Sequence, residues 1–339
     1  MTAGSAGPSR LRGAIGVLAF LLLAGSAEAA ARAWRPPRTA GGRPDLQGVW
    51  TNASITKLTR AQGTPLEVDA AAAARTAGAD PLRRMTAASA APIDPNLGAP
   101  AAGGDTGASF LDSGESLARI GGRYRMSWLV DPADGQLPLS PEGRRRVAKA
   151  QAFAAAAGAP TGPEALQPWD RCLISSRGSG GPGMLNNIYN SQLHIVQTPG
   201  AVVVLVEMVH DARVIPLFAS KSAAQAEHGP LDRWLGDSVG WWEGDTLVVE
   251  TTHVHAEQGR AGPIFLTPQG RVTERFTRSG PREIAYAFEV EDPAYYTRPW
   301  RAEMVLTTAD KPIYEYACHE GNYAIRGILA GARKADRGD

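Results

Sequence analysis

Cysteine is scarce in this chain. Only Cys172 and Cys318 occur among its 339 residues, and in an oxidising compartment such a pair predicts one structural disulfide. The bond would close a loop of well over a hundred residues and stabilise the fold by about 3–5 kcal/mol. Two separate buried thiols are the alternative. A nucleophilic cysteine is disfavoured because exported thiols tend to be oxidised.

Net charge is also low. The formal value is +1 at pH 7, with 20% charged residues, which gives no electrostatic reason to expect nucleic acid or an anionic membrane surface as a partner. The sequence has no phosphate-binding loop, no dinucleotide fingerprint and no serine in a nucleophile elbow. We therefore expect a small molecule as the partner and no cofactor. The sequence does not indicate the oligomeric state.

Long apolar runs are limited to the amino end. Arg10 and Arg12 precede an apolar stretch from Gly13 to Ala24, which is too short for a permanent membrane span. Ala27-Glu28-Ala29 follows as a small-x-small cleavage site, so residues 1–29 are predicted to be a signal peptide. No cysteine follows the stretch, and we expect no lipid anchor. The mature protein is expected to be periplasmic or secreted.

The rest of the chain predicts one β-rich domain. Residues 30–43 are rich in Arg, Pro and Gly and are expected to be a flexible lead-in, and the domain is expected to cover 44–335. An irregular insertion is expected at about 79–122, where small residues and prolines dominate. Helices are expected near 65–77, after a capping box, and near 141–157.

Short strands separated by turn signals dominate after Cys172. They predict an antiparallel meander that closes as a barrel or folds as a sandwich, with a few peripheral helices. The expected hairpins pair 193–197 with 202–208, 272–277 with 283–290, and 302–308 with 313–317; a further strand is expected at 246–252.

Three motifs carry a resemblance to other proteins. His210 to Leu217, Trp242 to Thr251 and Tyr314 to Tyr323 resemble a large group of secreted bacterial proteins, mostly hypothetical proteins of soil proteobacteria and acidobacteria. That resemblance brings no particular reaction with it. Gly48-Val49-Trp50 and the meander after it resemble lipocalin-like (calycin) barrels, which implies a barrel with a binding pocket.

The same motifs place acids and imidazoles in runs that otherwise read as strands. Glu207 shares a predicted strand face with Val203 and Leu205, and an ionised buried glutamate needs a partner. Arg213 and His210 are the nearest candidates. Either Glu207 forms a structural ion pair, or it is a carboxylate with a raised pKa that acts as a general acid or base.

The predicted catalytic residues are acids and histidines. Each of them could instead have only a structural role, in a turn or in an ion pair. The residues are Glu207, His210, Asp211, Glu250 and His319, and we expect them to line one pocket. The predicted substrate-binding set comprises an amide, aromatic rings and one arginine: Asn187, Tyr189, Arg213, Trp241, Trp242, Tyr316 and Tyr323. In a plain β-protein, these aromatic side chains would simply fill the core.

Three functions are compatible with these residues. The favoured one is an exported, cofactor-independent enzyme that uses carboxylate and histidine side chains for acid–base catalysis, as a lyase, isomerase, cyclase or hydrolase, on a small, partly apolar molecule. A periplasmic small-ligand binding protein is the first alternative. A metal-dependent hydrolase is the second, because His253 and His255 would share a strand face with Glu250 or Glu315 as a third ligand.

Overall fold

The computed structural model describes residues 1–2, 4, 34–89, 111–155, 162–320 and 322–337. The chain divides into two compact units, Met1–Arg35 and Pro36–Asp339. The predicted signal peptide lies almost entirely outside the described residues. Within those residues, no helix combines the length and the apolar character needed to cross a membrane.

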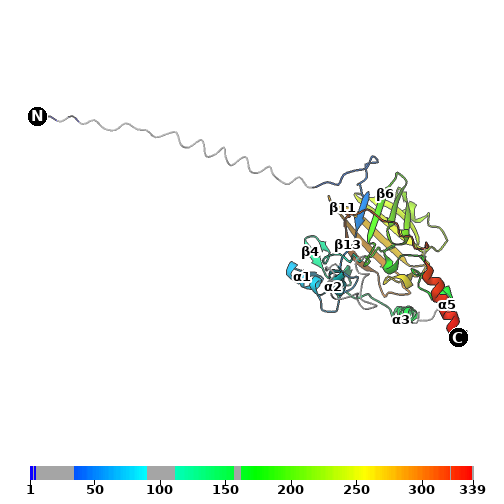
Figure 1. Ribbon diagram of the computed structural model, residues 1–339. Coiled ribbons are helices and arrows are strands. Elements are labelled where there is room, and N and C mark those ends of the chain that lie inside the picture. Colours follow the sequence, from blue (N-terminus) through cyan, green and yellow to red (C-terminus); the bar gives the residue numbers. More distant parts are fainter. Residues whose placement is uncertain (3, 5–33, 90–110, 156–161, 321, 338–339) are drawn as a thin grey trace. The chain divides into compact units, whose positions relative to one another are not determined.

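Nine strands of the described chain close into a barrel (Figure 1). In barrel order they are β1 (Gly48–Thr51), β6 (Gln192–Gln197), β7 (Ala201–Val206), β8 (Ala212–Phe218), β9 (Asp237–Glu243), β10 (Thr246–Thr252), β11 (Arg271–Gly280), β12 (Glu283–Glu291) and β13 (Trp300–Thr308). The pairing of β1 with both β6 and β13 completes the ring. All neighbours are antiparallel except β8 and β9. The prediction of a mainly β protein is confirmed, as a barrel rather than a sandwich.

Alternating side chains explain why these segments are strands. β7 buries Val202, Val204 and Val206 and leaves the residues between them half-exposed, which is the pattern of a strand with one face on the core. The turn before it is fixed because the Thr198 hydroxyl both accepts from the Ala201 N–H and donates to the Ala201 carbonyl. The predicted hairpin is therefore confirmed.

Aromatic side chains fill the barrel interior. Phe276 and Tyr286 have ring centroids 4.8 Å apart, and Phe288 packs edge-on against Trp300 at 5.8 Å. All four are at most 2% exposed. The core of the described chain therefore lies inside the barrel wall, where aromatic burial contributes much of the stability.

Helices and minor strands lie outside this wall. The helices of the described residues are α1 (Ala70–Ala79), α2 (Pro81–Ser89), α3 (Pro141–Ala155), α4 (Lys221–Gln225) and α5 (Tyr323–Arg337). β5 (Leu129–Asp131) extends the sheet beside β13, and β2 (Glu67–Val68), β3 (Arg119–Ile120) and β4 (Arg123–Arg125) form a separate small sheet. Single turns of 3₁₀-helix occur at Pro163–Ala165, Ser176–Gly178, Met208–His210 (η4) and Gln258–Ala261.

Two local predictions need correction. The helix expected at 65–77 begins only at Ala70, because Asp69 is its N-cap, accepting from the Ala72 N–H, and Glu67 instead joins the small sheet. The insertion expected to be irregular at 79–122 contains α2 and β3, although residues 90–110 lie outside the described part. The predicted start of α3 is confirmed, since the Ser140 hydroxyl accepts from the Gly143 N–H.

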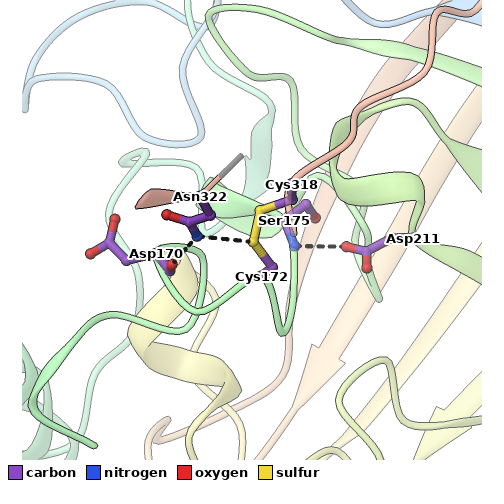
Figure 2. Close-up of a disulfide and its surroundings, with 6 residues drawn as sticks. All are labelled: Asp170, Cys172, Ser175, Asp211, Cys318 and Asn322. Carbon is purple, nitrogen blue, oxygen red and sulfur yellow. Dashed lines mark hydrogen bonds between the residues drawn. A yellow bond between two sulfur atoms is a disulfide. The ribbon is translucent and has the colours of Figure 1, made fainter. Parts of the chain in front are cut away.

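The predicted disulfide between Cys172 and Cys318 is present and joins residues 146 positions apart (Figure 2). The Asn322 side-chain amide lies over the bond, 3.6 Å from the Cys172 sulfur, and also donates to the Asp170 carbonyl at 3.2 Å. The bond therefore ties the chain before β6 to the chain after β13.

Candidate functional site

Glu207 and His210 hold the chain after β7 to the segment that contains Tyr314 and Tyr316. The Glu207 carboxylate accepts from the Tyr314 N–H at 3.0 Å, and the His210 Nε2 accepts from the Tyr316 N–H at 3.1 Å. Glu207 lies beyond the end of β7 and enters η4, so it does not continue the strand face on which it was predicted. Residues 313–317, expected as a strand, are an irregular segment held by these two bonds.

Asp211 is also held by the backbone. Its carboxylate accepts from the Ser175 N–H at 2.7 Å, beside the disulfide (Figure 2). Burial raises the pKa of Asp211, and the hydrogen bond from Ser175 offsets this only in part. The native state therefore disfavours the ionised carboxylate relative to the unfolded chain.

Asp211→Asn should match or exceed the stability of the unmodified protein at pH 7. Because the folded pKa is raised, the contribution of Asp211 is favourable below its ordinary pKa of 3.8 and is lost as the pH rises through the folded value. Asparagine keeps an acceptor for Ser175 and carries no charge. Urea unfolding at pH 7 and near pH 3 checks this, because the difference between the two proteins should vanish at the lower pH. A less stable variant at pH 7 would contradict it.

A buried charge network occupies the barrel interior. Arg213 on β8 donates to both carboxylate oxygens of Glu274 on β11, at 3.0 Å for the Nη1–Oε1 contact. The Tyr286 hydroxyl donates to the same carboxylate at 2.6 Å. Burial raises the pKa of Tyr286 well above its usual value, and Glu274 adds to the effect. For Arg213, burial alone would lower the pKa, but Glu274 outweighs it and the pKa is raised.

This network corrects the expected partner of Arg213. Arg213 pairs with Glu274, not with Glu207, and it is 3% exposed. The glycine-rich chain before β6 packs onto the network, since the Gly183 N–H donates to Glu274 at 3.3 Å and the Met184 N–H to Tyr286 at 2.8 Å. Arg213 is therefore buried and engaged with Glu274 within the barrel.

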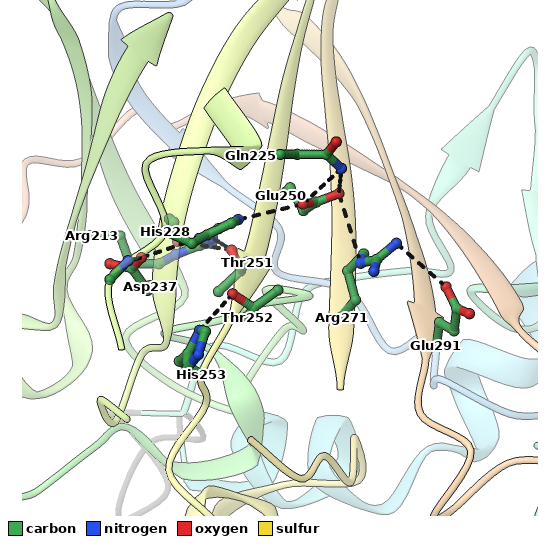
Figure 3. A network of polar contacts seen from close by, with 12 residues as sticks. Arg213, Gln225, His228, Asp237, Glu250, Thr251, Thr252, His253, Arg271 and Glu291 are labelled. Carbon is green, nitrogen blue, oxygen red and sulfur yellow. Dashed lines mark hydrogen bonds and ion pairs between the residues drawn. The ribbon is translucent and has the colours of Figure 1, made fainter. Parts of the chain in front are cut away.

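Glu250 lies on the outside of the barrel, away from the network of Arg213 and Glu274. Its strand alternates as predicted, with Val248 and Glu250 on the outer face of β10 and Val249 in the core. The outward face is covered by α4 and the chain after it, which leaves Glu250 3% exposed. The Gln225 amide nitrogen donates to both of its carboxylate oxygens, at 3.0 and 2.8 Å (Figure 3).

A histidine completes this arrangement. The His228 Nδ1 lies 3.1 Å from Asp237 Oδ2, and its Nε2 lies 3.4 Å from Glu250 Oε1 (Figure 3). Asp237 also accepts from the Gly229 N–H at 2.8 Å and pairs with Arg233 at 3.1 Å. The imidazole is therefore held between two carboxylates, and one of them, Asp237, is itself fixed by the backbone.

Glu250 and His228 line a pocket of about 720 Å³ on the outside of the barrel wall. Eight of the ten residues that line it are polar or charged; the ten are Gln225, His228, Pro230, Asp232, Glu250, Thr252, His253, Pro268, Gln269 and Arg271. None of Glu207, His210, Asp211 and His319 is in this lining, so the expectation that all five catalytic candidates share one pocket is not met here.

His253 enters the pocket with an unusual backbone. Its φ of +52° is a left-handed conformation that costs free energy for a residue other than glycine and recurs at functional sites. Its N–H donates to the Pro268 carbonyl, and its carbonyl accepts from the Arg233 N–H. The Nδ1 lies 2.9 Å from the Thr252 hydroxyl, while Nε2 has no hydrogen bond to a described residue.

His253 and His255 do not share a strand face, because β10 ends at Thr252. The ring of His255 stacks on Trp234 at 4.3 Å instead. No group of three or more His, Cys, Asp or Glu side chains in the described residues is arranged to hold a metal ion. The ligand set suggested by their spacing is therefore wrong.

The remaining candidates are scattered. Asn187 is 2% exposed, and its amide donates to the Ser176 hydroxyl at 2.8 Å. Trp241 packs under α4, and Trp242 lies beneath the Arg43 guanidinium. Tyr189 and Tyr316 lie beside each other at the irregular segment, where burial and Tyr189 raise the pKa of Tyr316. His319 and Tyr323 are exposed.

Sequence reasoning missed His228, Asp237 and Arg271. His228 lies in a loop without periodicity, and Asp237 stands at the first position of its strand, where an acid is unremarkable. The positive φ of His253 has no clear sequence signal either: histidine is among the non-glycine residues that adopt this conformation more often than most, but few histidines do so. The chain was also compared with family models, with curated proteins and with solved structures, and none of them matches it.

Proposed function

We propose that the protein is an exported enzyme that performs acid–base catalysis on a small molecule in the pocket lined by His228, Glu250 and His253. The observation that carries the proposal is the Asp237–His228–Glu250 arrangement, of which His228 and Glu250 line that pocket. The Cys172–Cys318 disulfide supports export, because such bonds persist in oxidising compartments. The proposed binding site is this outer pocket and not the barrel interior, because aromatic side chains fill the interior.

The couple of His228 and Glu250 is suited to proton transfer. When His228 Nδ1–H donates to Asp237, Nε2 is an acceptor that faces a carboxylate oxygen at 3.4 Å. One proton can then be held by Glu250 or by His228, and the Asp237 carboxylate stabilises the imidazolium that results. Glu250 would be the group that exchanges the proton with a bound molecule, and Asp237 a positioning residue.

His253 would supply the second acid–base group. Its Nδ1 is engaged with Thr252, and the ring centroids of His253 and His228 are 6.4 Å apart. Two titratable groups that line one pocket allow removal of a proton at one position and its return at another, as lyases and isomerases require. The strained backbone of His253 supports a functional role because only a tertiary constraint keeps it.

The proposal is tested with proton exchange and turnover. The purified protein is incubated in D₂O with small carbonyl compounds, carboxylic acids, sugars and esters, and loss of C–H signals or new products is followed by proton NMR. Glu250→Gln and His253→Asn should each lower the rate by about 10²-fold or more. His253→Asn should keep or raise the melting temperature, since asparagine tolerates positive φ better.

His255→Gln is the matched control, because His255 stacks on Trp234 and is absent from the pocket lining. Its rate should stay within about twofold of the unmodified protein. A chelator should leave all rates unchanged, whereas loss in chelator with recovery in zinc would favour the metal-dependent alternative. Full activity in both Glu250→Gln and His253→Asn would refute the proposal.

A further inference from the structure

One cation in the pocket has unused hydrogen-bond donors. Arg271 lies on the outer face of β11, and its side chain is 48% exposed. Its closest carboxylate contacts are 3.8 Å to Glu250 and 3.9 Å to Glu291, which are too long for hydrogen bonds. The guanidinium donates to no side chain or carbonyl of the described residues, although it carries five N–H donors.

Arg275 shows that exposure is not the reason. It follows four residues later on the same face of the same strand and is 46% exposed, yet its guanidinium donates to Glu243 at 2.8 Å (side-chain nitrogen to oxygen). Arg275 therefore donates a hydrogen bond to the carboxylate beside it, Glu243. Arg271 also has carboxylates nearby, Glu250 and Glu291, but donates to neither. Arg271 differs in that both oxygens of its nearest acid, Glu250, already accept hydrogen bonds, whereas the Glu243 oxygen that Arg275 uses accepts no other from a described residue.

That acid is Glu250. Both of its oxygens accept from Gln225, and Oε1 also faces His228. Two carboxylates therefore attract Arg271 without accepting hydrogen bonds from it. The N–H donors of its planar guanidinium stay unused by the described residues. Figure 3 shows Arg271 between Glu250 and Glu291. Among the described residues that line the pocket, Arg271 is the only arginine or lysine.

We infer that the substrate is a small organic anion, and that Arg271 binds its carboxylate or phosphate group through a bidentate pair of hydrogen bonds. The inference rests on the proposed acid–base function of the same pocket. An anionic group bound to Arg271 would place the adjoining carbon of the substrate near Glu250, which lines the same pocket. Arg271 is then the residue that selects substrates by charge.

The test is an anion titration that needs no turnover. The histidine side-chain ¹H–¹⁵N signals are followed by NMR at constant ionic strength while inorganic phosphate, succinate or neutral succinamide is added. Phosphate or succinate should shift the His253 and His228 signals to saturation, and succinamide should not. Whichever of the two anions binds more tightly identifies the group that the pocket prefers.

Variants decide the role of the arginine. Arg271→Gln should weaken anion binding at least tenfold, Arg271→Lys should weaken it less because the charge stays and the fork is lost, and Arg275→Gln should stay within twofold. Equal binding by the unmodified protein and Arg271→Gln would overturn the inference, as would saturation by succinamide alone.

The two proposals fail separately. Arg271-dependent anion binding together with full activity in Glu250→Gln and His253→Asn would reject acid–base catalysis and retain the anion site. Activity that depends on Glu250 and His253, with no anion binding at Arg271, would retain the catalytic proposal and reject the anionic substrate. Melting temperatures of the arginine variants within a few degrees of the unmodified protein confirm that each is folded.

Discussion

Glu274→Gln should destabilise the protein by about 3–5 kcal/mol, since it leaves the buried Arg213 guanidinium without a counter-charge. Arg213 and Glu274 are 3% and 0% exposed, so water cannot replace the lost carboxylate without opening the barrel. For a domain of about 300 residues, the melting temperature should fall by roughly 5–8 °C. Denaturant unfolding followed by tryptophan fluorescence measures the effect.

Glu243→Gln is the matched control. Glu243 pairs with Arg275 at 2.8 Å, also on the barrel wall, but both side chains are about half exposed, and such pairs contribute at most about 1 kcal/mol. A double variant, Arg213→Met with Glu274→Leu, should be less destabilised than Glu274→Gln alone, because no charge stays buried. If Glu274→Gln proves as mild as the control, the interior must be hydrated and not closed.

The strands were predictable because their signal is local. A strand such as β7 alternates buried and half-exposed residues over six positions, and the turn at Thr198 supplies its own hydrogen bonds. Tyr314 to Cys318 also alternates in type, but side-chain acceptors and a disulfide fix this segment, not a neighbouring strand. Alternation alone does not distinguish the two cases.

The site was predictable only where it lies within a strand. The face of Glu250 follows from its position between Val249 and Thr251, and the structure agrees. Which side chains meet in the folded protein depends on how distant parts of the chain are brought together. Arg213 and Glu274 are 61 residues apart, and His228 reaches Glu250 from a loop. Arg213 is close to Glu207 in the sequence, and nothing in the sequence favours the distant Glu274 as its partner.

Asp237→Asn should lower the turnover number by about 10²- to 10⁴-fold and leave KM nearly unchanged. Asp237 is not in the pocket lining, so it contributes to the transition state through His228 and not to substrate binding. An asparagine amide can donate to Nδ1, which would place the imidazole proton on Nε2, toward Glu250, and remove the charge that stabilises the imidazolium. Histidine ¹⁵N shifts should report this change of tautomer.

Arg233→Gln is the control for that result. Arg233 pairs with the other oxygen of Asp237 at 3.1 Å and is 59% exposed, so its loss leaves the Asp237–His228 contact in place and should change turnover less than about threefold. A tautomer shift in Asp237→Asn with no loss of turnover would show that His228 takes no part in catalysis. Equal losses in Asp237→Asn and Arg233→Gln, with unchanged ¹⁵N shifts, would show that Asp237 acts only by holding the loop around Gly229. A large kcat effect confined to Asp237→Asn would instead identify the carboxylate as the group that sets the protonation of the His228–Glu250 couple.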